Sequence, residues 1–297
     1  MEAALSGIAL SEMNWTGENA TIAQIERELA RLRVESSREG AQPNLRTSVM
    51  THIAWVPVQW QVAAEETLAG MGERHPSRTI LLVPRADAEE DGLDALVSLR
   101  CFPVGQRAIC GEVIELELRG RRAAAPASIV QPLLIADLPV FCRWRGEPPF
   151  GSTELEQMVD VVDRLIVDSE EWDDLRYHDL AHIFERVAVS DIAWRRTEGW
   201  RLELARHWPE IRDQEIELTG PRAEVTLLRA WLSARLARSI EDIALAEAPQ
   251  VAVRLAGEEL PRPRVLYDTP SDLLSAELDQ FARDRMYEEA VRAGAGV

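Results

Sequence analysis

A short polar turn, His75-Pro76-Ser77-Arg78, carries side chains that could bind a ligand. It falls between a predicted helix and a predicted strand, where α/β proteins often place ligand-contacting groups. Arg78 could hold an anion in a bidentate contact, assisted by Ser77 and a backbone N–H of the turn. The structural alternative is that Pro76 fixes the backbone and Arg78 pairs with a nearby carboxylate, and the residues alone favour this alternative.

Two histidines, His178 and His182, are four residues apart on a predicted helix, so both rings can face one side. This spacing is similar to that of helical zinc motifs, but Asp179 stands where such a motif has a glutamate as general base. No third ligand can be identified from the sequence. We therefore expect histidines of a helix surface or an interface, and no metal site.

Other catalytic signatures are not found in the sequence. It has no Gly-x-Ser-x-Gly elbow, and no Cys/His or Ser/His/Asp set stands out by its spacing. A Gly-x-Gly-x-x-Gly loop and a Walker A loop are also missing, although α/β folds without them can still bind nucleotides. We predict a protein that is not an enzyme and that uses no cofactor.

The composition of the chain argues against two classes of partner, nucleic acid and membrane. The chain has 297 residues, of which 46% are hydrophobic, and its 51 acidic and 33 basic residues give a net charge of −18. Such a charge repels nucleic acid on average. Residues 1–21 lack the pattern of a signal peptide, and no run approaches 18 apolar residues. We expect a cytosolic protein that binds neither nucleic acid nor membrane.

The three cysteines, Cys101, Cys110 and Cys142, are too few and too irregularly spaced for a disulfide framework or a zinc site. We expect reduced thiols. The alternative is that Cys101 and Cys110 meet across a hairpin and form a redox switch.

The hydrophobic pattern predicts an α/β protein with two domains and mixed sheets flanked by helices. After a loose polar start, an amphipathic helix begins near Ile22, and apolar runs at 48–56, 79–83, 95–101 and 139–144 predict strands. Ile114, Leu116 and Leu118 alternate with glutamates, as in an antiparallel strand with one wet face. We place an N-terminal α/β domain, with its leading amphipathic helix, at 1–169 and a C-terminal α+β domain at 170–297.

In the second half, the pattern predicts helices over 172–187, 194–206 and 223–238, with strand alternation near 216–218 and 251–255. Ser271 is the expected N-cap of a last helix that carries Phe281. Tryptophans in this half lie near arginines, and both residue types are favoured at protein interfaces. The alternative is that most of these rings fill the core.

Five short motifs resemble the glucose-6-phosphate dehydrogenase assembly protein family (OpcA family). In chain order, these are residues 73–78 with the strand that follows, 132–140 leading to Arg143-Trp144, 163–169, 190–196 and 286–290. Their order and spacing match the family over roughly residues 45 to 290. The resemblance implies a bacterial cytoplasmic protein that binds glucose-6-phosphate dehydrogenase, promotes its active oligomer and raises its activity. It would thereby support NADPH production in the pentose phosphate pathway.

The same motifs suggest the residues that form an interface or a phosphate-binding corner. They are His75, Ser77, Arg78, Asp137, Trp144, Asp163, Arg164, Asp168 and Trp194. The runner-up hypothesis is a sugar-phosphate-binding protein or enzyme, in which Arg78 holds the phosphate and His75 serves as acid or base. A third hypothesis combines the two, with a phosphometabolite regulating assembly. We expect that these 297 residues leave no room for the extra module that some cyanobacterial members carry.

Overall fold

A computed structural model describes residues 11–39, 44–45, 48–68, 71–104 and 107–296. The chain divides into two compact units, residues 1–165 and 166–297, which we call the N-terminal and C-terminal units. Both contain helices and strands, which confirms the predicted α/β class with mixed sheets. That the chain folds as two independent domains, at 1–169 and 170–297, stays a prediction.

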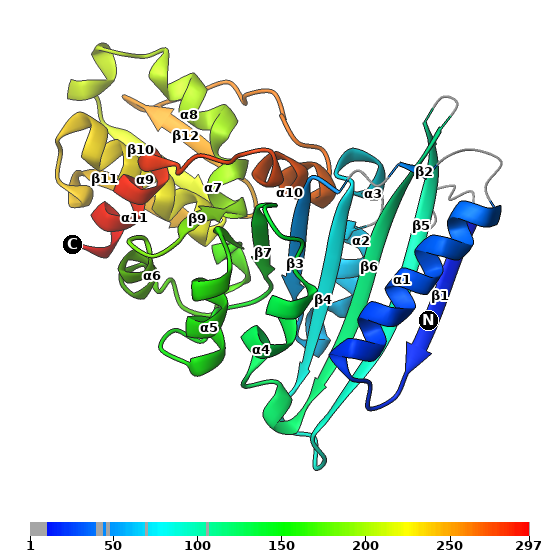
Figure 1. Ribbon diagram of the computed structural model, residues 1–297. Helices are drawn as coiled ribbons and strands as arrows, with labels where there is room; N and C mark the ends of the chain where they lie inside the picture. The colour runs from blue at the N-terminus through cyan, green and yellow to red at the C-terminus, as the bar shows by residue number, and fades with distance from the viewer. Residues whose placement is uncertain (1–10, 40–43, 46–47, 69–70, 105–106, 297) are drawn as a thin grey trace. The chain divides into compact units, whose positions relative to one another are not determined.

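A mixed sheet forms the centre of the N-terminal unit (Figure 1). The strands run in the order β1-β5-β6-β4-β3-β7, and the short β2 pairs with β6. β4 is parallel to β3 and β6, β7 is parallel to β3, and β5 is antiparallel to β1 and β6. The strands are β1 (Ser11–Gly17), β2 (Asn44–Leu45), β3 (Met50–Trp55), β4 (Ser77–Arg85), β5 (Gly92–Val104), β6 (Arg107–Arg119) and β7 (Val140–Trp144).

The sequence pattern explains the place of each strand. Every residue of β3 is buried, as expected for a strand between two parallel neighbours that is covered on both faces. In β6, Ile114, Leu116 and Leu118 are fully buried, whereas the alternate Glu115 and Glu117 are partly exposed. The period of two therefore correctly marks the buried face of β6, although only one of its two long neighbours is antiparallel.

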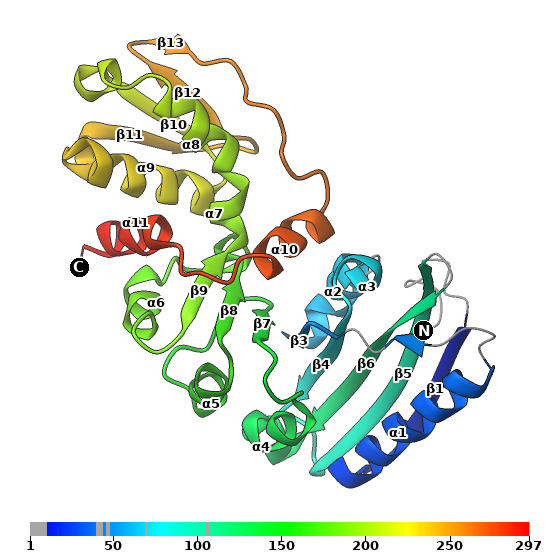
Figure 2. The ribbon, with the colours of Figure 1, turned by 45° about the horizontal axis from the view of Figure 1, so that its top comes forward.

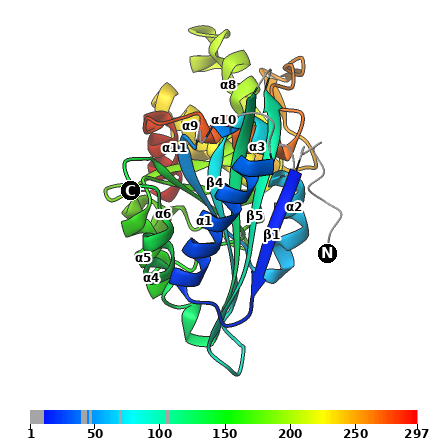
Figure 3. The ribbon, with the colours of Figure 1, turned by 45° about the vertical axis from the view of Figure 1, so that its right-hand side comes forward.

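Helices cover both faces of this sheet. α1 turns Ile25, Leu29 and Leu32 inward, because their spacing puts them on one face, and it lies along β5 (Figure 3). On the opposite face, Ala64 of α2 packs with Ala54 and Leu81. The helices of this unit are α1 (Ile22–Glu39), α2 (Gln61–Leu68), α3 (Met71–Arg74), α4 (Pro126–Val130) and α5 (Thr153–Val161).

The C-terminal unit has a separate four-stranded sheet in the order β11-β10-β12-β13. Its strands are β10 (Ile216–Gly220), β11 (Ile243–Glu247), β12 (Ala252–Leu255) and β13 (Glu258–Glu259), and β8 (Arg164–Val167) and β9 (Ala188–Asp191) neighbour each other outside it. The helices are α6 (Tyr177–Ile183), α7 (Ile192–Arg196), α8 (Glu198–Ala205), α9 (Arg222–Leu236), α10 (Pro270–Leu278) and α11 (Arg285–Ala295).

The core of this unit lies between α9 and the four-stranded sheet. Leu228 and Leu232 of α9 join Ile216, Ile243 and Val253 of the strands in one buried cluster. α11 packs between α9 and α6 (Figure 2). Among the helices in the described ranges, none is long and apolar enough to cross a membrane.

Several element boundaries differ from the prediction. The polar start contains β1, an edge strand with alternating exposed residues. The helix predicted over 172–187 is only α6, and the one predicted over 194–206 breaks at Thr197 into α7 and α8. Thr197 adopts helical dihedrals, but its hydroxyl bonds to the carbonyl of Trp194, which offers the backbone a competing local contact.

The last predicted helix is two helices. Thr269, not Ser271, caps α10 through a reciprocal pair of hydrogen bonds with Asp272. α10 ends at Leu278, so Phe281 lies beyond it and is exposed. Asp284 then caps α11, which contains the 286–290 motif.

Cys101 and Cys110 form a disulfide, so the expectation of reduced thiols is wrong for this pair. The physical reason is strand register: β5 and β6 place the two residues directly opposite each other, with their Cα atoms 4.0 Å apart. Cys142 is free and buried, and its burial raises the pKa of its thiol to about 12.

We expect thiol labelling to distinguish these cysteines. In denaturant without reductant, an alkylating reagent should modify Cys142 alone, because Cys101 and Cys110 are joined. After reduction all three should react. Mass spectrometry of the labelled chain reads out both states. Modification of all three residues before reduction would show that the protein does not hold this bond.

Candidate functional site

The predicted ligand turn, His75 to Arg78, is buried. The backbone N–H of His75 bonds to the carbonyl of Met71 at the end of α3, and Ser77 and Arg78 open β4. The Ser77 and Thr79 hydroxyls lie 3.2 Å apart. Arg78 is only 4% exposed. The turn therefore offers little surface to a ligand.

Arg78 is engaged inside the N-terminal unit. Its Nε lies 2.8 Å from Oε2 of Glu112, and Nη1 donates to the carbonyl of Leu133. Arg33 of α1 donates to the other oxygen of Glu112 at 2.6 Å. Burial acts to raise the pKa of Glu112, but the two guanidinium groups hold it below its ordinary value. This geometry favours the structural alternative for Arg78.

His52 is a neutral residue close to the same turn. It is buried in β3, and burial lowers its pKa to about 4, with further lowering by the charges of His75 and Arg143. A neutral His52 cannot supply charge to bind an anion at physiological pH. Arg78 is already paired with Glu112, and His52 is neutral. Phosphate binding at His75 to Arg78 therefore stays a prediction that this geometry does not support.

Three more predicted residues stabilise the N-terminal unit. Trp144 is 1% exposed and stacks on Trp55 with ring centroids 4.6 Å apart. Asp163 accepts a hydrogen bond of 2.8 Å from the backbone of Val140, at the start of β7. Arg164 is fully buried. By contrast, Asp137 is exposed in the turn before β7 and has a positive φ of 64°.

In the C-terminal unit, two neighbouring strands end in an aspartate. Asp168 follows β8 and accepts the N–H of Glu170, and Asp191 ends β9 and accepts the N–H of Ala193. Each carboxylate thus caps the helical turn that follows its strand, which is why aspartate suits this junction. Both side chains are buried. Neighbouring strands bring these capping groups close together.

The two carboxylates belong to a connected polar group, which we call the Asp191 cluster: Asp168, Ser169, Tyr177, Asp191, Arg196 and Tyr287. Ser169 donates to Asp191 through both its hydroxyl, at 2.6 Å, and its backbone N–H, at 3.1 Å. Tyr287 donates to Asp191 at 3.3 Å, and Tyr177 shares a 3.0 Å hydrogen bond with Ser169.

Arg196 neutralises the other carboxylate of the cluster. Its Nη1 and Nη2 lie 3.0 and 2.6 Å from the two oxygens of Asp168, a bidentate contact. No described residue forms an ion pair with Asp191. Burial therefore raises the pKa of Asp191 to about 7, and the charge of Asp168 adds to this shift.

Trp194 is positioned by polar contacts rather than exposed to a partner. Its Nε1 donates to Oδ2 of Asp284 at 2.8 Å, and the Arg201 guanidinium lies 3.6 Å from its ring centroid. Burial lowers the pKa of Arg201 to about 10. Trp194 thus ties α7 to the cap of α11.

The Asp191 cluster is not arranged for catalysis. Ser169 is fully buried, and its hydrogen-bonded neighbours are an aspartate and a tyrosine, without a histidine to act as base. His178 and His182 face each other at 3.2 Å on α6, exposed to solvent. Within the described residues, no group of three or more His, Cys, Asp or Glu could hold a metal ion.

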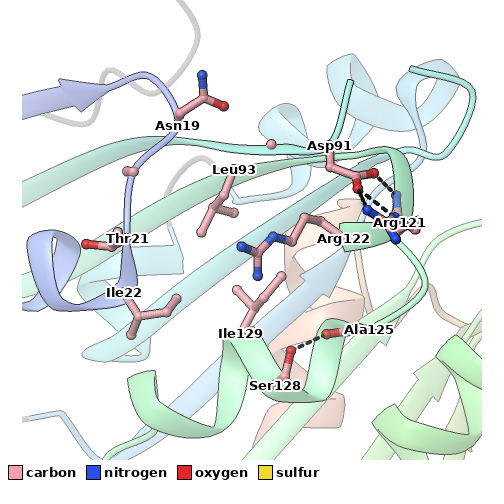
Figure 4. Close-up of a pocket in the computed structure, with 12 residues that line it drawn as sticks. Asn19, Thr21, Ile22, Asp91, Leu93, Arg121, Arg122, Ala125, Ser128 and Ile129 are labelled. Carbon is pink, nitrogen blue, oxygen red and sulfur yellow. Dashed lines mark hydrogen bonds and ion pairs between the residues drawn. The ribbon is translucent and has the colours of Figure 1, made fainter. Parts of the chain in front are cut away.

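A surface pocket of about 690 Å³ lies in the N-terminal unit, between the start of α1, β5 and the segment 121–129 (Figure 4). Asp91 accepts from the backbone and side chain of Arg121, and these contacts lower its pKa. Figure 4 shows the Arg122 side chain extending toward Thr21 and Ile22. Among the described residues that line this pocket, Asp91 is the one carboxylate, and it is paired with Arg121.

Comparison with known proteins agrees with the arrangement of motifs. Residues 70–183 match the family described as the glucose-6-phosphate dehydrogenase subunit N-terminal domain. A relative from Synechocystis sp., the OxPP cycle protein OpcA, is 24% identical over 180 residues. Both findings show a similarity to glucose-6-phosphate dehydrogenase assembly proteins over part of this chain. The similarity covers 54% of this chain and 37% of the Synechocystis protein.

The family match contains three of the five motifs, and those at 190–196 and 286–290 lie beyond it. The structure nevertheless brings residues of three motifs together, since Ser169, Asp191 and Tyr287 meet in one cluster. Among these three motifs, the sequence analysis selected only Asp163, Arg164, Asp168 and Trp194 as site residues. An aspartate at each strand-to-helix junction was the signal that could have indicated Asp191.

We predict that Arg78→Ala lowers the free energy of unfolding by about 3 kcal/mol, because it leaves the buried Glu112 with Arg33 alone. Arg85→Ala, on the same strand, is the matched control. Arg85 is partly exposed and pairs with Glu117 at 3.5 Å, so its loss should change stability by less than about 1 kcal/mol. Urea unfolding measures both. An unchanged midpoint of urea unfolding for Arg78→Ala would contradict the structural role and favour the anion-binding role.

We predict a pH dependence of stability that originates at Asp191. Its pKa is raised on folding from 3.8 to about 7, so the folded state keeps the proton that the unfolded state loses. The contribution of Asp191 to the free energy of unfolding should therefore fall as pH rises from about 4 to about 7, by up to about 1.4 kcal/mol per pH unit.

Asp191→Asn should remove the contribution of Asp191 from the measured slope, because an amide does not titrate and can still accept from the backbone of Ser169 and Ala193. Asp173→Asn, at an exposed position, should keep the wild-type slope. Urea unfolding at several pH values compares the three proteins. Equal slopes for wild type and Asp191→Asn would contradict the assignment.

Proposed function

We propose that this protein binds glucose-6-phosphate dehydrogenase, promotes its active oligomer and raises its activity without chemistry of its own. The observation that carries the proposal is the family match over residues 70–183. The Synechocystis relative, named as a protein of the OxPP cycle, supports the same metabolic context. The dehydrogenase is cytoplasmic in this proposal, and so is the protein that activates it.

The polar residues of the motifs support a non-catalytic role. Inside the protein, Arg78 forms an ion pair with Glu112, and Asp168 forms one with Arg196. Ser169 donates a hydrogen bond to Asp191. These contacts stabilise the fold and leave no motif side chain of this set directed at a substrate. The runner-up function, a sugar-phosphate site at His75 to Arg78, gains nothing from this geometry.

Activation then follows from differential affinity. A partner that binds the active arrangement of the dehydrogenase better than the inactive one shifts the equilibrium between the two. A coupling free energy of about 1–3 kcal/mol changes an apparent affinity roughly 5- to 150-fold. The activator itself needs only a surface of suitable shape and composition.

Trp208 is the best candidate for an anchor on that surface. Six tryptophans follow residue 140, of which Trp144, Trp172, Trp194 and Trp200 are buried and Trp231 is partly buried. Trp208 is 55% exposed, and the Arg212 guanidinium lies 5.7 Å from its ring centroid. Tryptophan and arginine are the residue types most often found at the energetic centre of an interface.

We predict a saturable rise in the rate of the cognate dehydrogenase when this protein is titrated at sub-saturating substrate. Light scattering of the mixture should show a complex of defined mass. Trp208→Ala should weaken the complex at least about tenfold, the effect of losing one central anchor. Val34→Ser removes an exposed apolar side chain from α1 and should leave binding unchanged. If wild-type protein neither forms a complex nor changes the rate, the proposal fails.

A further inference from the structure

A second pocket, of about 380 Å³, lies within the C-terminal unit. Its walls are the junction of α7 and α8, the start of α9, the β11–β12 connection and the segment 262–270 that leads into α10. Cavities of this volume are typical of small-molecule sites. We call it the Arg262 pocket.

The lining of the Arg262 pocket is rich in positive charge. Four arginines line it, Arg195, Arg196, Arg262 and Arg264, against the two carboxyl groups of Glu224 and Asp268. The whole chain, by contrast, has a net charge of −18. A concave region with an excess of one charge concentrates ligands of the opposite sign. The pocket therefore favours an anion.

Two of these arginines are available to a ligand. Arg195 is held by Glu277 at 2.6 Å, and Arg196 by Asp168 at 2.6 Å. Arg262 and Arg264 are exposed and have no hydrogen bond or ion pair with any residue that the structure describes. Two free guanidinium groups, separated in the sequence by Pro263 alone, can bind the oxygens of one phosphate.

The segment that carries Arg262 and Arg264 is fixed in place. Gly199 of α8 lets it approach closely, since a Cβ at this position would lie 3.3 Å from the carbonyl oxygen of Arg264. The Tyr267 hydroxyl donates to Glu198 at 2.6 Å, and the Arg195 guanidinium lies 6.0 Å from the Tyr267 ring centroid. Such a wall needs little rearrangement on binding.

The rest of the lining suits an organic ligand better than a bare ion. Trp200 and Val251 supply apolar surface, and Gln250 supplies a neutral polar group. Burial raises the pKa of Glu224 to about 7, so near neutral pH a large share of this carboxyl is protonated and can donate a hydrogen bond. A hydroxylated carbon skeleton would match this mixture of groups.

We propose that the Arg262 pocket binds a small phosphate monoester, whose phosphate is held by Arg262 and Arg264. A phosphate monoester carries a charge of about −1.5 to −2 at pH 7, which two free guanidinium groups match. Its organic part would lie toward Trp200 and Gln250. This site lies in the C-terminal unit and is independent of the proposed binding to the dehydrogenase.

Calorimetry on the full-length protein tests the proposal. The probes are glucose 6-phosphate, glucose and inorganic phosphate, each titrated to millimolar concentration in a buffer free of phosphate and sulfate. We expect saturable binding of glucose 6-phosphate, at least about tenfold weaker binding of inorganic phosphate, and no binding of glucose. Absence of binding by both phosphate-bearing probes would overturn the proposal.

Variants locate the site. Arg262→Gln with Arg264→Gln should weaken binding of glucose 6-phosphate at least about tenfold, because both free guanidinium groups are lost. Arg285→Gln removes one exposed arginine outside the pocket and should retain wild-type affinity. Thermal unfolding checks that each variant is folded. Unchanged affinity in the double variant would place the anion elsewhere and refute this assignment.

Discussion

The C-terminal unit depends on one buried carboxyl group, that of Asp191. It accepts hydrogen bonds from Ser169, Ala193 and Tyr287, which belong to three separate segments of the chain. Because an unpaired polar group in the interior costs free energy, each of these segments is held in the position that satisfies it. The chain end and the first strands of the unit are thereby joined. The hydrogen bond between Tyr287 and Asp191 fixes the position of α11, which then packs against α9 and α6.

Glu112 performs a comparable role in the N-terminal unit. It lies on β6 and receives guanidinium groups from Arg78 on β4 and Arg33 on α1. Two buried networks of this kind explain how a chain of high negative charge keeps charged motif residues inside, because each charge is paired or proton-bearing. Such rigidity would preserve the shape of the surface through which the proposed binding occurs.

Much of the secondary structure could be read from the sequence, because α1, β4 and β6 have clear periodic patterns. Helix boundaries that are set by side-chain capping were harder to predict from the sequence. The competition between Thr269 and Ser271 as N-cap depends on Pro270, which suits the first position of a helix. The environment of Arg78 could not be predicted, since its partner Glu112 is 34 residues away and reaches it only through the pairing of β4 with β6.

The place of β3 in the sheet has a consequence for work with fragments. β3 lies between β4 and β7, and it is parallel to both. The family match begins at residue 70, after β3, and ends at residue 183, inside α6. A polypeptide cut at those limits would lack the middle of its sheet, and the edges of β4 and β7 would expose unpaired backbone groups that favour self-association. The limits of the family match are therefore not the limits of a unit that can fold.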